Sequence, residues 1–94
     1  MKNKNQTPTK TILDEAKSVV YGSRQADYGS VTENFTRISK MWSVILNSDV
    51  TPEQVALCMC ATKIARQCHK HKTDNLTDLA GYAATIEKMN NENK

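Results

Sequence analysis

Basic and aromatic side chains are spaced along this 94-residue chain so that a helical fold can gather them around an anion. An arginine guanidinium matches two phosphate oxygens, and a lysine adds a point charge. A tyrosine beside them can stack on a base or donate a hydrogen bond. We predict that these residues form a phosphate-binding set: Arg24, Tyr28, Arg37, Lys63 and Arg66. The alternative is that Lys63 and Arg66 pair internally with Asp78 and Glu33.

A second polar set lies towards the C-terminus. Asp74 and Asp78 are one helical turn apart, which is the spacing of two carboxylates that could hold Mg²⁺. Asp78 could instead read a base edge or a ribose hydroxyl together with Asn34, or orient Lys63 or Arg66. Tyr82 follows one turn later and could stack or hydrogen-bond. Because so few other carboxylates are free, we predict no metal and no cofactor.

Three cysteines and two histidines fall within one stretch, Cys58 to His71. On a helix Cys58 and Cys60 point about 160° apart, so they do not share a metal easily. We expect Cys58 and Cys68 to pack as small hydrophobic residues and the histidines to lie at a solvated helix end. The sequence shows no nucleophile–base pair and no glycine-rich phosphate loop, so we predict no catalytic residue.

The stretch that must position the basic residues is Thr51–His71. Thr51, Pro52 and Gln54 form a helix start with a capping box. Residues 55–61 are apolar almost all round, which predicts a central helix with neighbours on every side. Lys63 and Arg66 continue one side of this helix.

Three further helices are expected around it. The first begins at Thr9 or Thr11 and stops at Gly22. The second starts at the Ser30 box, ends near Asn47 and presents its apolar stripe, Ile45 and Leu46 included, to the core. The fourth is expected to be capped by Asp74. The fold class is therefore all-α, a compact four-helix bundle-like subunit, in which a short connection predicts that the second and third helices are antiparallel.

Composition sets the remaining expectations. We predict one domain over 10–89 between flexible tails at 1–9 and 90–94, and a functional loop over 22–29. The net charge of +3 is not concentrated in one block, so no long nucleic acid is expected. No stretch could cross a membrane, which favours the cytoplasm. The apolar helix over 55–61 predicts a homo-oligomer.

Several motifs resemble a family of small phage and prophage proteins of unknown function. They are GSRQADYG from Gly22, NFTRI from Asn34, Trp42, VALCMCATKIAR from Val55 and DLAGY from Asp78. The chain also distantly resembles the MazG-type all-α nucleotide pyrophosphohydrolases. Those enzymes hold Mg²⁺ with E-x-x-E and E-x-x-D pairs. Here Glu33 lacks a partner carboxylate at position 36, so the likeness implies a nucleotide pocket with a reduced metal site.

Three functions follow as hypotheses. The leading one is a nucleotide-binding protein, a sponge that sequesters cyclic or other signalling nucleotides of bacterial anti-phage immunity. The second is a MazG-like pyrophosphohydrolase that uses Mg²⁺ on Asp74 and Asp78. The third is an inhibitor that binds a host protein. Each would act in the cytoplasm of an infected or lysogenic bacterial host.

Overall fold

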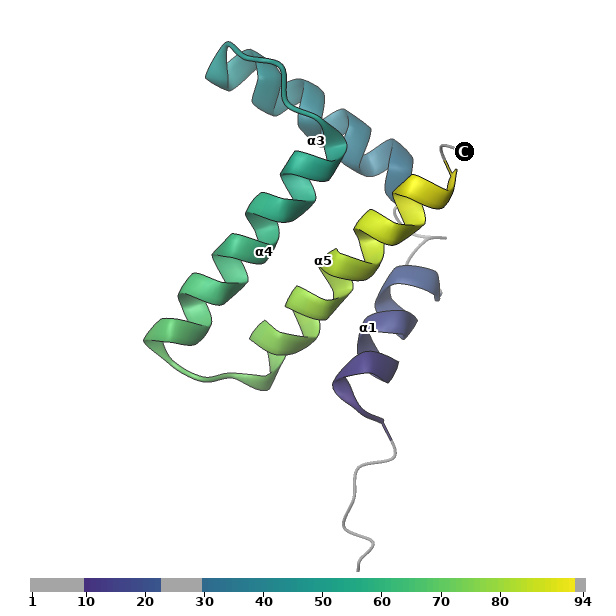
Figure 1. The fold of residues 1–94 in the computed structure, drawn as a ribbon, viewed down its shortest axis with the longest axis vertical. Helices are drawn as coiled ribbons and strands as arrows, with labels where there is room; N and C mark the ends of the chain where they lie inside the picture. The colour runs from purple at the N-terminus through teal and green to yellow at the C-terminus, as the bar shows by residue number, and fades with distance from the viewer. Residues whose placement is uncertain (1–9, 23–29, 93–94) are drawn as a thin grey trace, which may run out of the picture.

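The computed structural model describes residues 10–22 and 30–92, and these form four helices without a strand. The helices are α1 (Ile12–Tyr21), α3 (Val31–Leu46), α4 (Pro52–His69) and α5 (Thr73–Glu92), shown in Figure 1. The all-α prediction is confirmed. Positions 23–29, which hold most of the expected functional loop with Arg24 and Tyr28, lie outside the described residues.

The N-termini of the first three helices are set by local hydrogen bonds, as their sequences predict. The side-chain oxygens of Thr11, Ser30 and Thr51 each accept a hydrogen bond from the backbone N–H three residues later. The side chain of that later residue accepts in return from the backbone N–H of the capping residue. A capping box satisfies backbone N–H groups that a helix leaves unpaired. The fourth start is different, because α5 begins at Thr73 and Asp74 lies within its first turn. The prediction of Asp74 as the cap is therefore wrong.

Helix α5, not α4, is the central element. It contacts α1, α3 and α4, and in Figure 1 it lies between α4 and α1. The apolar composition of residues 55–61 does not translate into burial all round: Val55 and Ala56 are buried, but Leu57 is 50% exposed. Within the described chain α4 packs on one side only, so the prediction of a central α4 is wrong.

Helix α3 crosses the end of the α4–α5 pair obliquely and projects beyond it, so the expected antiparallel pairing with α4 is not observed (Figure 1). In its last turn Ile45 and Leu46 are 77% and 61% exposed. Their predicted place in the core is wrong. The chain turns back because the backbone N–H of Val50 donates to Ser43 Oγ at 2.9 Å.

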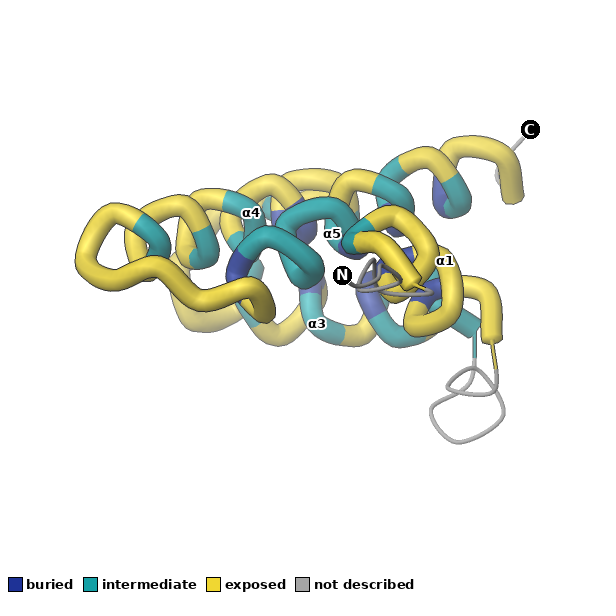
Figure 2. The backbone as a smooth tube through the Cα atoms, turned by 90° about the horizontal axis from the view of Figure 1, so that it is seen from below, coloured by how far each residue is buried: buried dark blue, intermediate teal, exposed yellow. Residues whose placement is uncertain are grey.

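The core gathers where α3, α4 and α5 meet. Phe35, Val55, Ala56 and Met89 form its buried cluster. In Figure 2 the buried segments lie where the helices face one another, while most of α4 is exposed. Helix α1 adds Ala16 and Val20, which are buried. Burying a large aliphatic side chain stabilises a fold by about 1.5–3 kcal/mol, so this small cluster carries much of the stability.

Residues 90–92, placed by the sequence in a tail, belong to α5. The end of this helix holds two others in position. Lys88 Nζ lies 3.5 Å from the Val20 carbonyl oxygen and 5.1 Å from the centre of the Tyr21 ring. The Thr32 hydroxyl donates to Glu92. No helix in the described ranges is long and apolar enough to cross a bilayer.

A candidate ligand pocket

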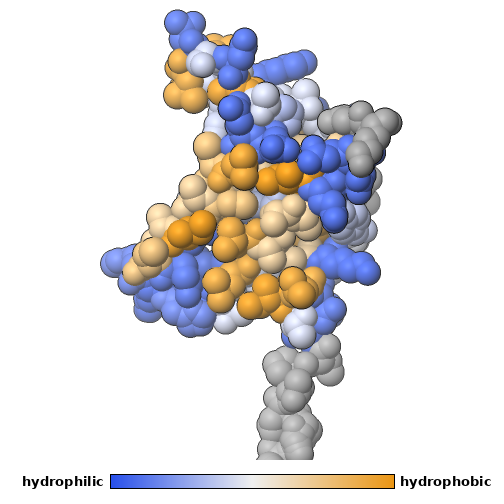
Figure 3. Space-filling model, viewed as in Figure 1, coloured by the Kyte–Doolittle hydropathy of each residue, from blue (hydrophilic) through white to orange (hydrophobic). Residues whose placement is uncertain are grey.

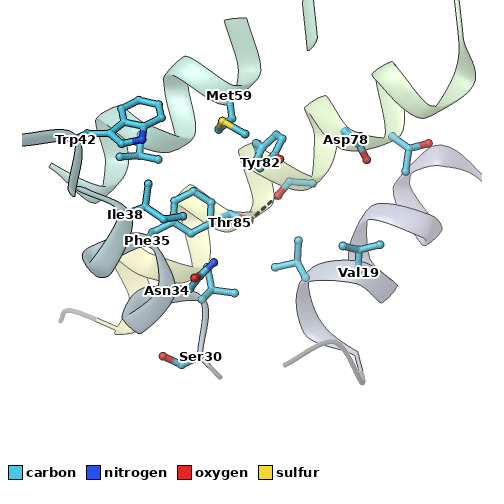
Figure 4. Close-up of a pocket in the computed structure, with 15 residues that line it drawn as sticks. Val19, Ser30, Asn34, Phe35, Ile38, Trp42, Met59, Asp78, Tyr82 and Thr85 are labelled. Atoms are coloured by element: carbon cyan, nitrogen blue, oxygen red, sulfur yellow. Dashed lines mark hydrogen bonds between the residues drawn. The ribbon is translucent and has the colours of Figure 1, made fainter. Parts of the chain in front are cut away.

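A pocket of about 410 Å³ opens where the four helices converge (Figure 4). Its walls are mainly apolar and come from every helix. They are formed by Val19, Val20, Ser30, Val31, Asn34, Phe35, Ile38, Trp42, Val55, Met59, Thr77, Asp78, Gly81, Tyr82 and Thr85. Phe35 and Tyr82 meet edge to face, with ring centroids 6.4 Å apart. The pocket therefore combines an aromatic wall with a few polar groups.

The wall from α1 approaches α5 closely at Gly81. A methyl group added to Gly81 would lie 3.9 Å from Val20 Cγ2, an ordinary van der Waals distance. Gly81 thus faces another helix, but alanine would also fit there. Nearby, the buried Thr85 hydroxyl donates to the Gly81 carbonyl oxygen at 2.9 Å.

Three polar groups in the wall have no hydrogen-bond partner within residues 10–22 and 30–92. Among the described residues, nothing hydrogen-bonds the Asn34 amide, the Tyr82 hydroxyl or the Trp42 indole N–H. Polar groups in a partly buried site gain from a partner there, because half-buried donors lose some of their water. These three groups are available to a ligand.

At one side of the pocket Lys63 and Asp78 form an ion pair. Lys63 Nζ lies 2.8 Å from Asp78 Oδ2, and the two side chains are 14% and 44% exposed. Asp78 lines the pocket, so its partner Lys63 places a positive charge at the pocket margin. The hypothesis that Lys63 pairs internally with Asp78 is confirmed as a contact, and the pair stands beside a cavity.

The other predicted binding residues are distributed differently. Asn34, Asp78 and Tyr82 line the pocket. Arg37 and Arg66 are exposed and are not part of its wall. Asp74 is exposed in the first turn of α5. The structure thus brings together four of the predicted residues, counting Lys63 through its ion pair.

The sequence also left residues of the wall unassigned. Phe35 and Trp42, on the apolar stripe of α3, belong to both the core and the pocket wall. Met59, Thr77 and Thr85 had no predicted binding role. The sequence around these residues does not indicate that they line a pocket, because they do so only when α4 and α5 pack side by side.

No three His, Cys, Asp or Glu side chains gather as metal ligands within residues 10–22 and 30–92. Of the three free cysteines, Cys58 and Cys68 are exposed, and Cys60 is partly buried with Sγ 4.0 Å from the Leu79 carbonyl oxygen. Desolvation raises the pKa of the Cys60 thiol above its usual value. None of the three cysteines lines this pocket. The prediction that Cys58 and Cys68 pack as small hydrophobic residues is wrong, because both are exposed.

Comparison with known proteins gives a family for this chain. Residues 11–90 match the model of a domain of unknown function, DUF6378. The chain belongs to this family. The matched range contains all four helices except the end of α5, and it contains the whole pocket.

Curated relatives place this DUF6378 chain among phage proteins. It is 40% identical over 81 residues to the Gene 55 protein of Mycobacterium phage L5, covering 84% of this chain and 52% of that protein. It is 35% identical over 85 residues to the Gene 55 protein of Mycobacterium phage D29, covering 89% and 56%. The chain thus spans about half the length of these relatives. No solved structure matches it significantly.

The resemblance to a phage family of unknown function is therefore confirmed. The site of this DUF6378 domain is a half-enclosed, mainly apolar space with a lysine–aspartate pair at its margin. Its wall also carries polar groups on Asn34, Trp42 and Tyr82 that have no hydrogen-bond partner among the described residues.

Proposed function

We propose that this phage protein binds a phosphate-bearing nucleotide in the four-helix pocket. One observation carries the proposal: an aromatic, mainly apolar cavity of about 410 Å³ has unpartnered polar side chains in its wall and a lysine at its margin. Small-molecule sites are typically cavities of about 300–1,000 Å³ with a few polar groups that fix orientation. A nucleotide has a flat apolar face, polar edges and an anionic end, and each matches one part of this pocket.

The base would lie against the aromatic wall. Stacking of a base on an aromatic side chain contributes about 1–3 kcal/mol, and the apolar lining from Phe35 and Trp42 adds desolvation. The Asn34 amide carries both donors and an acceptor, so it can pair with a base edge. The Tyr82 hydroxyl can bond a base or a ribose oxygen. The free state of these groups supports a ligand that brings its own polar edges.

The phosphate would lie towards Lys63. Its ammonium already faces Asp78, so a phosphate would share or replace that carboxylate as partner. Asp78 could then accept a hydrogen bond from a ribose hydroxyl or a base amine. Arg37 and Arg66 are exposed and add long-range attraction for an anion without lining the pocket. Arg24 and Tyr28 remain predicted contacts outside the described residues.

Isothermal titration with cyclic and linear nucleotides tests this proposal. We expect micromolar or tighter binding of at least one of them. Asn34→Ala should weaken that binding about tenfold, the equivalent of about 1.4 kcal/mol. Asn90→Ala is the matched control, because Asn90 is exposed on α5 and absent from the pocket wall. If a folded protein binds no nucleotide at millimolar concentration, the proposal is wrong.

In a phage protein such binding would serve as a sponge that withholds a signalling nucleotide from the anti-phage immunity of the host. A sponge returns its ligand unchanged. We therefore expect the bound nucleotide to be recovered intact after heat denaturation. Recovery of a shortened nucleotide would contradict the sponge hypothesis, because it would show that the protein hydrolyses its ligand.

The MazG-like alternative rests on Asp74 and Asp78, one turn apart on α5. It requires release of pyrophosphate from a nucleoside triphosphate in Mg²⁺ or Mn²⁺, and loss of that release in Asp78→Asn. The inhibitor alternative requires a host protein that binds the chain when no nucleotide does. The same titration and product analysis therefore separate the three hypotheses.

A further inference from the structure

A stripe of apolar side chains runs along the outer side of α4. Leu57, Ala61, Ile64 and Cys68 are spaced by four, three and four residues, which is the spacing of one helical seam. Leu57 and Ile64 are 50% and 51% exposed, and Ala61 and Cys68 are exposed too. In Figure 3 apolar side chains cover much of the face on which α4 and α5 lie. Nothing in the described chain covers this stripe.

The two ends of α4 carry opposite charges. Asp49 and Glu53 lie at its N-terminal end, and Glu53 stands one turn before Leu57 on the same side as the stripe. The C-terminal end carries the exposed run His69, Lys70, His71 and Lys72. In an antiparallel pair of α4 helices, the acidic end of each helix would therefore face the basic end of the other. In a parallel pair, ends of the same charge would face each other.

We infer that the outer face of α4 docks against the same face of a second copy, antiparallel and about a two-fold axis near Ala61. An isologous contact is self-complementary when each half of the surface matches the other half. The α4 surface meets this condition in both charge and shape, since Leu57 and Ile64 flank the small Ala61. Small residues allow two helix backbones to approach closely, and α4 offers 18 residues for the contact.

The position of the stripe separates this interface from the pocket. The pocket residues of α4, Val55 and Met59, lie on the opposite side of the helix from Leu57. Two copies joined through α4 would thus keep two open pockets facing away from the contact. The α4 contact between two copies can therefore be tested independently of nucleotide binding.

Light scattering after size exclusion tests the interface. The wild-type chain should elute with twice the 10.5 kDa mass of one chain at high micromolar concentration. Ile64→Glu should shift the mass to that of one chain while the circular dichroism spectrum stays helical. Thr62→Glu is the matched control and should remain a dimer, because Thr62 is exposed on α4 away from the stripe. A monomeric wild type, or a dimer that survives Ile64→Glu, overturns the inference.

Single cysteines test the orientation. With the native cysteines replaced by alanine, Ala61→Cys should form an intermolecular disulfide, because residues near the axis meet their own copies. A chain that keeps only Cys68 should not crosslink, since the antiparallel arrangement places the two Cys68 residues at opposite ends. Crosslinking through Cys68, or none through position 61, contradicts the antiparallel contact.

Discussion

Lys63 of α4 and Asp78 of α5 are joined by an ion pair with an N–O distance of 2.8 Å beside the pocket. Lys63 is mostly covered and Asp78 is nearly half exposed, so the lysine is held in place while the carboxylate reaches water and the pocket. The pair joins two antiparallel helices. Under the proposed function Lys63 would also attract the phosphate of a nucleotide. The effect of mutation on stability and on binding separates these two roles.

Lys63→Met removes the charge and keeps most of the apolar stem. We expect unfolding free energy to fall by less than about 1 kcal/mol, because water replaces the partner of a half-exposed carboxylate. We expect nucleotide affinity to fall at least about tenfold, since a phosphate has lost its cation. Urea denaturation and calorimetry measure the two effects. A large loss of stability with unchanged affinity would show that the pair is structural.

Met89 is 3% exposed within the core cluster, and Met41 is 54% exposed on α3. Met89→Ala should lower the unfolding free energy by about 2–5 kcal/mol, since it creates a cavity where three helices meet. Met41→Ala is the control with the same chemical change, and it should alter stability by less than about 0.5 kcal/mol. Equal effects of the two substitutions, measured by chemical denaturation, would contradict the described core.

The Asp14 carboxyl has its pKa lowered below 3.8, first by the Thr11 backbone N–H and then by the Thr11 hydroxyl. Because the Asp14 pKa is lower in the folded state than in the unfolded state, the ionised carboxylate stabilises the helix at pH values above the unfolded-state pKa. This stabilisation is lost as the pH falls through the folded-state pKa. We therefore expect the first turn of α1 to fray below about pH 4. Carbon NMR titration of Asp14 should report a midpoint below 3.8. In Asp14→Asn the turn should show no such transition.

The three thiols should differ in reactivity. Burial raises the pKa of Cys60, and the thiolate is the reactive form, so Cys60 should react more slowly than the exposed Cys58 and Cys68. In Ile64→Glu, in which no second copy is expected to cover Cys68, a disulfide reagent such as Ellman's reagent should titrate two thiols quickly and the third slowly in the folded protein. All three should react alike in denaturant. Mass spectrometry should assign the slow site, and a fast Cys60 would contradict its burial.

Local chemistry was predictable from the sequence, while packing partners were not. Thr11, Ser30 and Thr51 each form their capping box with a residue three positions away, so the sequence contains the whole interaction. The fourth helix does not start at a box on Asp74: with Asp74 as its cap it would begin at residue 75, two residues later than the observed Thr73. The helices themselves followed from apolar periodicity.

The choice of central helix failed because composition does not say which helix another one packs against. Leu57 and Ile45 are apolar residues on amphipathic helices, yet both are exposed since α3 crosses the bundle end and α4 packs on one side. The pocket shows the same limit. Its polar residues Asn34, Asp78 and Tyr82 could be picked out by type, but the wall from α1 depends on long-range contacts.

The single tryptophan, Trp42, allows a direct test of whether a nucleotide occupies the four-helix pocket. A nitrogen–proton NMR spectrum contains one indole signal, from Trp42, together with the side-chain amide of Asn34. We predict that titration with the bound nucleotide shifts both signals at the same concentration and leaves the side-chain amide of Gln67, outside the pocket, unchanged. If the nucleotide leaves the Trp42 and Asn34 signals unshifted at millimolar concentration, it does not occupy the four-helix pocket.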